Sequence, residues 1–196
     1  GVEGPSKTIS IVRDQIKLEE QAAKSEVIEN DSQSRIGVIT IPTFYSDFAA
    51  QARNDPDYKS TTRDTRKLLE ELESQDIDGI IIDLRDNGGG SLSEAIDFTG
   101  LFIESGPVVQ TKDSAGNIDI NRDIDPSIIY GGPLAVLVNR NSASASEIFA
   151  GAIQDYQRGI IIGEPTFGKG TVQNIIDLNR FSRSKNGYGR LKTTIA

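Results

Sequence analysis

Two segments of this sequence carry residues that could take part in catalysis. In the first, residues 141–147 (NSASASE), three serines alternate with alanines. The second, residues 168–170 (GKG), places a lysine between two glycines. The chain has no histidine, so a Ser-His-Asp triad within it is excluded. If one of the serines is a nucleophile, a lysine is the natural group to accept its proton.

The serine segment also has a purely structural interpretation. Residues 144–147 (SASE) match S-x-x-E, the capping box that begins many helices. A serine at a turn from strand to helix lies near free backbone N–H groups and the positive end of the helix dipole, which stabilise a developing oxyanion. Taken alone, the segment favours capping, and it indicates catalysis only in combination with a base.

The lysine segment resembles a phosphate-binding loop. Residues 163–170 (GEPTFGKG) nearly match G-x-x-x-x-G-K-[ST] and follow an apolar run, as that pattern requires. Position 170 is glycine, so the hydroxyl that would ligate magnesium is missing. Residues 171–176 (TVQNII) predict a strand, whereas a phosphate loop opens a helix. Nucleotide binding is therefore the weaker alternative, and a titration with ATP and magnesium would detect it.

A catalytic base is the other interpretation of Lys169. An unperturbed lysine has a pKa of about 10.4 and carries a proton at neutral pH. A base needs a pKa of about 7–8, which burial in apolar surroundings can supply. Phe167, Val172 and residues 160–162 (III) could provide them. The structural alternative is an exposed loop lysine, the usual place for this residue.

A third segment, residues 83–90 (DLRDNGGG), follows an apolar run and ends in three glycines. A turn of this kind lets backbone N–H groups approach a ligand closely, so it could donate to an oxyanion or pair with a substrate backbone. A flexible turn from strand to helix is the simpler explanation of three glycines taken by themselves.

Composition excludes several classes of function. The formal net charge is −8, with 29 acidic and 21 basic residues, so nucleic acid and anionic membrane surfaces are disfavoured partners. With neither cysteine nor histidine, a structural zinc site is excluded, and nothing implies another metal or an organic cofactor. No apolar run is long enough to span a membrane. The chain has no initiator Met and no signal peptide, which we expect of a processed or excised piece.

Apolar runs alternate with amphipathic segments, which predicts an α/β fold with a mostly parallel sheet covered on its faces. An N-terminal polar segment and a mobile loop at 179–187 flank this pattern. We predict strands at 7–13, 25–29, 36–42, 79–84, 107–111, 134–138 and 159–163, extended segments at 171–178 and 190–196, and helices at 62–74, 92–103 and 144–156.

Taken together, segments 82–90, 142–148 and 163–173 resemble the carboxyl-terminal processing, or tail-specific, serine proteases in order and spacing. The similarity runs through most of residues 7–178, and residues 149–156 resemble the periplasmic bacterial branch. The resemblance implies a layered, spiral-like sheet core with flanking helices, as in crotonase-like and Clp-like proteins. It also implies a strand and linker at 1–35 that follow an absent PDZ domain, and a protease core at 36–196 that is truncated at its C-terminus.

The same resemblance assigns roles to individual residues. Ser144 corresponds to the nucleophile, Lys169 to the general base and Gln173 to a third member that positions the lysine. The backbone N–H of Ala145 and that of Gly89 or Gly90 would form the oxyanion hole.

The implied reaction is hydrolysis of proteins with exposed apolar C-terminal tails, through an acyl-enzyme and without a cofactor. Unfolded or tagged proteins and the chain's own PDZ domain would be the partners, and the periplasm the location. A peptide-binding module that has lost catalysis is the remaining alternative.

Overall fold

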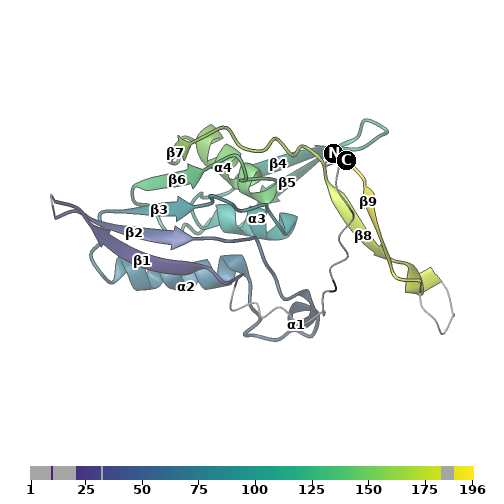
Figure 1. Cartoon of the computed structure of the whole chain (residues 1–196), viewed down its shortest axis with the longest axis horizontal. Helices are drawn as coiled ribbons and strands as arrows, with labels where there is room; N and C mark the ends of the chain where they lie inside the picture. Colours follow the sequence, from purple (N-terminus) through teal and green to yellow (C-terminus); the bar gives the residue numbers. More distant parts are fainter. Residues whose placement is uncertain (1–9, 11–20, 32, 182–187) are drawn as a thin grey trace.

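A five-stranded sheet forms the centre of the computed structural model, which describes residues 10, 21–31, 33–181 and 188–196 (Figure 1). Its order is β1-β2-β3-β6-β7. β1 is antiparallel to β2, and the remaining neighbours are parallel. The strands are β1 (Lys24–Glu29), β2 (Arg35–Thr40), β3 (Gly79–Asp83), β6 (Leu134–Val138) and β7 (Ile160–Gly163). The predicted α/β class with a mostly parallel sheet is confirmed.

Helices and two smaller sheets surround this centre. The helices are α1 (Phe48–Ala52), α2 (Thr61–Glu73), α3 (Leu92–Gly100) and α4 (Ala145–Asp155). Two-stranded antiparallel sheets are formed by β4 (Gly106–Lys112) with β5 (Ile118–Asp123), and by β8 (Gln173–Asp177) with β9 (Arg190–Thr194). Serine side chains begin two of the helices, because Ser60 Oγ accepts from Arg63 N and Ser91 Oγ accepts from Glu94 N.

The main core lies between the five-stranded sheet and the layer of helices α2, α3 and α4. Alternate residues of the strands, such as Ile82 and Val136, face this layer and are fully buried. Phe98 of α3 lies at the centre of an aromatic cluster. Its ring centroid is 5.4 Å from Phe44, 5.6 Å from Phe102 and 4.7 Å from Phe149.

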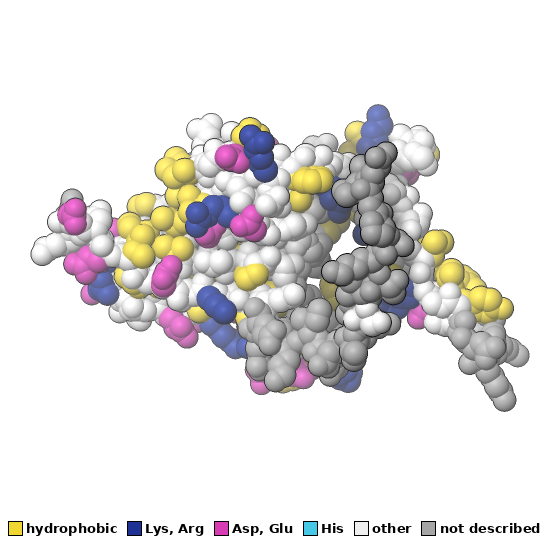
Figure 2. All heavy atoms as spheres, in the orientation of Figure 1, with side chains coloured by type: hydrophobic (Ala, Val, Ile, Leu, Met, Phe, Trp, Pro, Cys, Tyr) yellow, Lys and Arg dark blue, Asp and Glu magenta, His cyan; other side chains and the backbone are white. Residues whose placement is uncertain are grey.

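The opposite face of the sheet is only half covered by the residues that the structure describes. Ile81 and Leu137 face this side and are half-buried, while Ile160 and Ile162 of the edge strand β7 are 63% and 46% exposed. Figure 2 shows hydrophobic side chains gathered over the sheet, at the left of the view. Among the described residues, the predicted cover is complete on the helical face and partial on the other.

Several elements differ from the prediction. No strand is predicted at β5, whose Ile118 and Ile120 alternate with polar residues and are exposed. No helix is predicted at α1, which has five residues. β1 precedes residue 36, where we expected the core to begin, yet it is paired with β2 along its length. The predicted strand at 7–13 and most of the loop at 179–187 lie outside the described residues.

Three carboxylates lie close together where α3 packs against β5. Glu94 and Asp123 are buried, and Asp123 Oδ2 has no hydrogen-bond partner among the described residues. Burial raises the pKa of Asp97, and the charges of Glu94 and Asp123 raise it further.

No helix in the described part of the chain has the length and apolar character that crossing a bilayer requires.

Replacing Asp97 by asparagine should stabilise the protein at neutral pH. The contribution of a carboxyl whose pKa is raised by folding is fully present below its unfolded pKa, and it is lost as the pH rises through the folded pKa. Asp97→Asn should therefore have a higher free energy of unfolding than the wild type at pH 7. The difference should shrink as the pH falls through the raised folded pKa, and it should vanish below the ordinary aspartate pKa of about 3.9. Urea titrations at several pH values measure it, and a pH-independent difference would contradict this explanation.

Phe98→Ala should be among the most damaging changes in the core. It removes a fully buried ring from the centre of the aromatic cluster, so we expect a loss of about 3–5 kcal/mol in the free energy of unfolding. Phe48→Ala is the matched control, because this ring is 59% exposed and its loss should change stability by about 0.5 kcal/mol or less. Urea denaturation of both variants tests the contrast.

Candidate active site

The parallel strands bring the three motif segments to one edge of the sheet. β3, β6 and β7 are neighbours in the sheet, and each is followed directly by one segment. Residues 84–90 follow β3, residues 139–144 follow β6, and residues 164–172 follow β7. Because the carboxyl ends of parallel strands lie at the same edge, the three segments form one cluster.

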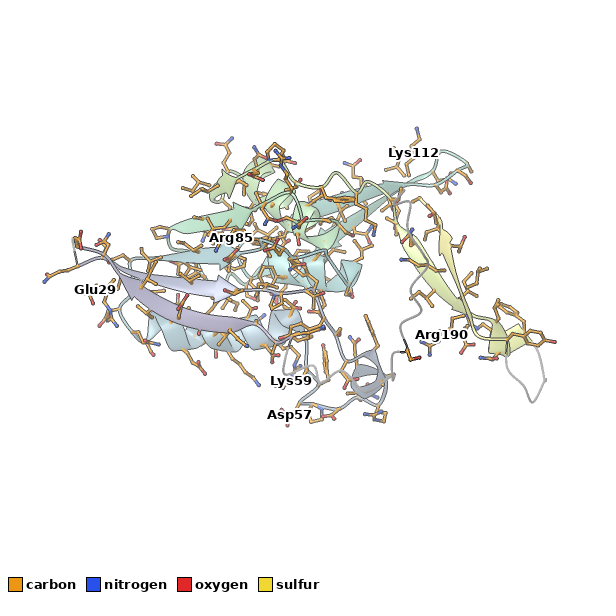
Figure 3. The ribbon with its side chains drawn as sticks, viewed as in Figure 1. Glu29, Asp57, Lys59, Arg85, Lys112 and Arg190 are labelled. Atoms are coloured by element: carbon orange, nitrogen blue, oxygen red, sulfur yellow. The ribbon has the colours of Figure 1, made fainter. Side chains whose placement is uncertain are left out.

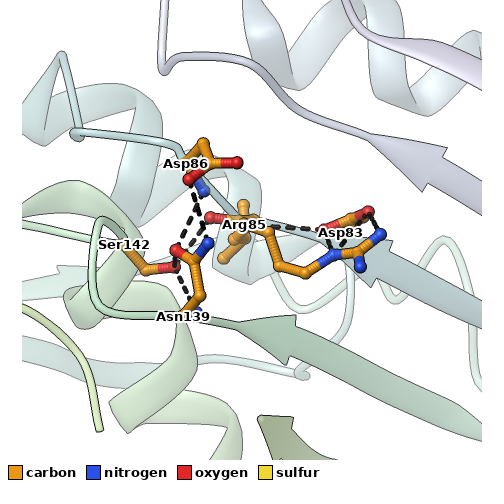
Figure 4. Close-up of polar contacts among 6 residues, drawn as sticks. Asp83, Arg85, Asp86, Asn139 and Ser142 are labelled. Atoms are coloured by element: carbon orange, nitrogen blue, oxygen red, sulfur yellow. Dashed lines mark hydrogen bonds and ion pairs between the residues drawn. The ribbon is translucent and has the colours of Figure 1, made fainter. Parts of the chain in front are cut away.

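Polar side chains join the glycine turn to the serine turn (Figure 4). Asn139 Nδ2 donates to Asp86 Oδ1 at 2.9 Å, as Figure 4 shows. Asn141 Nδ2 donates to the same oxygen at 2.8 Å. These two hydrogen bonds hold the pKa of Asp86 below its usual range. Beside them, Arg85 forms an ion pair with Asp83 at the carboxyl end of β3. Figure 3 shows Arg85 near the middle of the molecule, whereas Glu29, at the end of β1, and Lys112, at the end of β4, lie at its periphery.

Asn87 anchors the glycine turn from within. It is fully buried, its Nδ2 donates to Ile41 O at 2.7 Å, and its Oδ1 accepts from Gly89 N at 2.8 Å. Gly89 has φ +99°, and a Cβ there would lie 2.7 Å from Ser144 Cβ. Only glycine fits at this close approach. The turn is therefore held rigidly against the serine segment, and it is not merely a flexible connection.

The three serines of the segment have different environments. Ser142 and Ser146 are fully buried, and each hydroxyl donates to a backbone carbonyl: Ser142 Oγ to Leu84 O at 2.8 Å and Ser146 Oγ to Asn87 O at 3.0 Å. Ser144 is half-buried and lies on the wall of a cavity. The outer two serines therefore fasten the serine turn to the glycine turn, which leaves Ser144 as the hydroxyl that faces open space.

Ser144 has an unusual backbone. Its φ is +57° and it stands at the N-cap of α4, a conformation that a residue other than glycine adopts at a cost of about 1–3 kcal/mol. Its N–H donates to Glu147 Oε2 at 2.7 Å, so the capping glutamate is present as the sequence predicts. The strained turn lifts the Ser144 side chain towards the lysine segment.

Lys169 Nζ lies 3.4 Å from Ser144 Oγ, and the lysine is half-buried. Among the described residues, Lys169 forms no ion pair with a carboxylate. The separation slightly exceeds the 2.6–3.2 Å typical of a strong catalytic hydrogen bond, as is common before a substrate binds. The structure thus brings together the two residues that the sequence selected as nucleophile and base.

The loop of residues 164–172 does not have the form of a phosphate-binding loop. It leads into strand β8 and not into a helix. The backbone N–H groups of Gly168 and Lys169 donate to the two oxygens of Glu147, at 2.6 and 3.0 Å. In a phosphate loop such groups bind the anion, but here the protein's own carboxylate occupies them. The sequence similarity to that loop is therefore misleading.

The hydrogen bonds to Glu147 also change its ionisation. Burial opposes the charged form, but donors from Gly168, Ser144, Thr166 and Lys169 outweigh it, so the pKa of Glu147 is lowered. Sequence analysis identified Glu147 only as a helix cap. The S-x-x-E pattern signals the cap, whereas the contacts with the loop join residues that are distant in the sequence.

A cavity of about 570 Å³ opens beside Ser144 and Lys169. Its larger apolar lining residues are Leu92, Val109, Ile148, Val172 and Ile175, and no described residue that lines it is acidic. Gln173 also lines it, with its Nε2 3.5 Å from Thr194 Oγ1. Within the described residues, no group of three or more acidic side chains is placed to hold a metal ion. The cavity could receive an extended, apolar peptide.

Two backbone N–H groups at the cavity are available for an oxyanion. Ala145 and Gly90 both line it, and their N–H groups have no hydrogen-bond acceptor among the described residues. The N–H of Gly89 is already donated to Asn87. Of the two glycines that the sequence offered, Gly90 therefore has the free donor.

Comparisons with known proteins agree in pointing to one family. Residues 35–196 match the family model described as Peptidase family S41. The chain is 49% identical to a tail-specific protease of Haemophilus influenzae over 98% of its own length and 26% of the relative's. It is 31% identical to a chloroplastic C-terminal processing peptidase of Tetradesmus obliquus, over 91% of the chain and 37% of the relative.

A solved structure gives the same result. The photosystem II D1 C-terminal processing protease is similar with a TM-score of 0.69 and 30% identity, over 89% of this chain and 42% of that one. The chain therefore spans between about a quarter and two fifths of these longer proteins.

The environments of the serines predict different effects on stability. Ser146→Ala removes the donor to a buried carbonyl, so the free energy of unfolding should fall by about 1–2 kcal/mol. Ser144→Ala removes a half-exposed hydroxyl and should change it by about 0.5 kcal/mol or less. Urea denaturation of the two variants measures both values. Equal losses would show that Ser144 is fastened into the fold as Ser146 is.

Proposed function

The chain belongs to peptidase family S41, and from this we propose that it is the catalytic core of a serine endopeptidase acting through Ser144 and Lys169. The observation that carries the proposal is the 3.4 Å approach of Lys169 Nζ to Ser144 Oγ at the wall of a cavity. The chain has no histidine, so no imidazole of its own can serve as the base.

The proposed reaction proceeds in two halves. Neutral Lys169 accepts the proton of Ser144 Oγ, and the oxygen attacks the carbonyl carbon of the scissile peptide bond. The lysine then returns the proton to the leaving amine, which departs as the new N-terminus. A water molecule gives a proton to Lys169 and attacks the acyl carbon. As the ester bond to Ser144 breaks, Lys169 passes this proton to Ser144 Oγ, and the new C-terminus leaves and ionises to a carboxylate.

The negative oxygen of each tetrahedral intermediate needs hydrogen-bond donors. We assign this role to the N–H of Ala145, at the start of α4, and to that of Gly90. Neither donor has an acceptor in the part of the chain that the structure describes, and both residues line the cavity with Ser144. Losing one such donor typically costs about 10²–10³ in rate.

Gln173 is proposed as the residue that positions the lysine when substrate is bound. It lines the same cavity as Lys169, which supports the role. In the structure its amide contacts Thr194 at 3.5 Å, a long hydrogen bond that leaves the side chain free to turn.

The proposed substrates are unfolded or tagged proteins with exposed apolar C-terminal tails. The apolar residues of the cavity support this choice, as do the names of the relatives, a tail-specific protease and a C-terminal processing peptidase. We further propose that the whole protein contains a PDZ domain that delivers these tails, and that it acts in the periplasm.

Mutation of the pair tests the proposal in a full-length protein containing this chain. Ser144→Ala should lower cleavage of an unfolded protein with an apolar C-terminus by about 10⁴-fold or more. Lys169→Ala should lower it by about 10²–10⁴-fold. Lys169→Arg should not restore it, because arginine does not lose its proton in this range. The rate is measured by gel or mass spectrometry.

Lys67→Ala on the exposed side of α2 is the matched control and should cleave normally. Active Ser144→Ala protein would remove the nucleophile assignment, and active Lys169→Arg protein would remove the base. A wild type that binds the tail without cleaving it would instead identify an inactive peptide-binding module.

A further inference from the structure

The carboxylate of Glu147 connects the backbone of the proposed nucleophile to that of the proposed base. Its Oε2 accepts from Ser144 N at 2.7 Å and from Lys169 N at 3.0 Å. Its Oε1 accepts from Gly168 N at 2.6 Å and from Thr166 Oγ1 at 2.8 Å. One oxygen atom is therefore shared between the main chains of the two residues whose side chains must meet.

We propose that Glu147 is a positioning residue that holds the lysine loop, residues 166–169, against the serine turn and so sets the distance between Lys169 Nζ and Ser144 Oγ. This inference rests on the proposed function, because it assumes that these two atoms exchange a proton. Glu147 itself does not touch the reacting atoms in this scheme and acts through Lys169.

Other contacts of the lysine loop are few. Phe167 N donates to Ser142 O at 3.0 Å, but the Phe167 ring is 67% exposed and does not anchor the loop by packing. Gly168 has φ +85°, and neither it nor Gly170 has an atom within 4 Å of an added Cβ. Such a loop has high conformational freedom by itself. Among the described residues, five hydrogen bonds tie it to the serine turn and α4, and three of them end on Glu147.

The chemistry of the site favours a carboxylate over an amide. Four donors converge on the side chain, and an ionised carboxylate offers about four acceptor positions. A glutamine would direct an NH₂ group at two of these donors. The negative charge also lies in the first turn of α4, where the helix dipole stabilises it, and the lowered pKa of Glu147 keeps it charged at neutral pH.

A double-mutant cycle in a full-length protein containing this chain separates positioning from general stability. The readout is the rate at which a fluorophosphonate, a small reagent that labels activated serines, modifies Ser144, measured by mass spectrometry. Glu147→Gln should lower this rate by about 10- to 100-fold, in line with the effect of misplacing a catalytic group. In a Lys169→Ala background, the same change should have less than about a 2-fold effect, because Glu147 acts through the lysine.

Two further variants control the result. Glu94→Gln makes the same change at the same position of α3, where the carboxylate contacts Thr62 and not the lysine loop. It should leave the labelling rate within about 2-fold. Thr166→Val removes one donor without altering the cap of α4, and it should lower labelling by about 2- to 5-fold, again only when Lys169 is present. This variant decides the matter if circular dichroism shows that Glu147→Gln is unfolded.

The outcomes separate the two proposals. If Lys169→Ala labels as fast as the wild type, the proposed base fails. Two outcomes would keep the base but show that the positioning role is wrong. In the first, Lys169→Ala labels slowly and Glu147→Gln labels at the normal rate. In the second, Glu147→Gln slows labelling by the same factor whether or not Lys169 is present. An equal loss in Glu94→Gln would show that Glu147→Gln acts through a general loss of stability, and the positioning role would be wrong.

Discussion

The parallel alignment of β3, β6 and β7 is the constraint on which the rest of the site depends. Since these strands are neighbours and run in the same direction, their following loops must leave the sheet at one edge. Segments that are about 25 to 80 residues apart in the sequence are thereby brought within hydrogen-bond distance. An antiparallel neighbour would have sent one of the loops to the opposite end of the sheet, and the serine and lysine could not have met.

The sheet brings the loops together, but buried polar side chains fix them. Asn87, Ser142 and Ser146 satisfy backbone groups of the glycine and serine turns, and Glu147 does the same for the lysine loop. Each side chain forms a hydrogen bond with a backbone group that would otherwise bind water. The proposed catalytic pair is thus supported by a larger number of residues whose hydroxyl, amide and carboxylate groups are hydrogen-bonded.

The central elements could be predicted from the sequence, because apolar runs such as 79–84 and 134–138 form strands of the sheet. β5 could not, since its isoleucines face solvent and no burial pattern marks it. For the site, motif similarity located Ser144 and Lys169. The choice of Gly90 over Gly89 and the second role of Glu147 depended on which N–H groups are already engaged, a property of the folded backbone that no local pattern encodes.

The close contact between Gly89 and Ser144 separates residues that the fold requires from residues that the proposed chemistry requires. An added Cβ at position 89 would meet the Cβ of residue 144, and every amino acid except glycine has that atom. The glycine is therefore required by the path of the backbone, whatever the chemistry of residue 144. A descendant that had lost its nucleophile to alanine would still need Gly89. The glycine turn would then mark the fold in diverging sequences. Whether such a sequence encodes an enzyme would have to be judged from its serine and lysine.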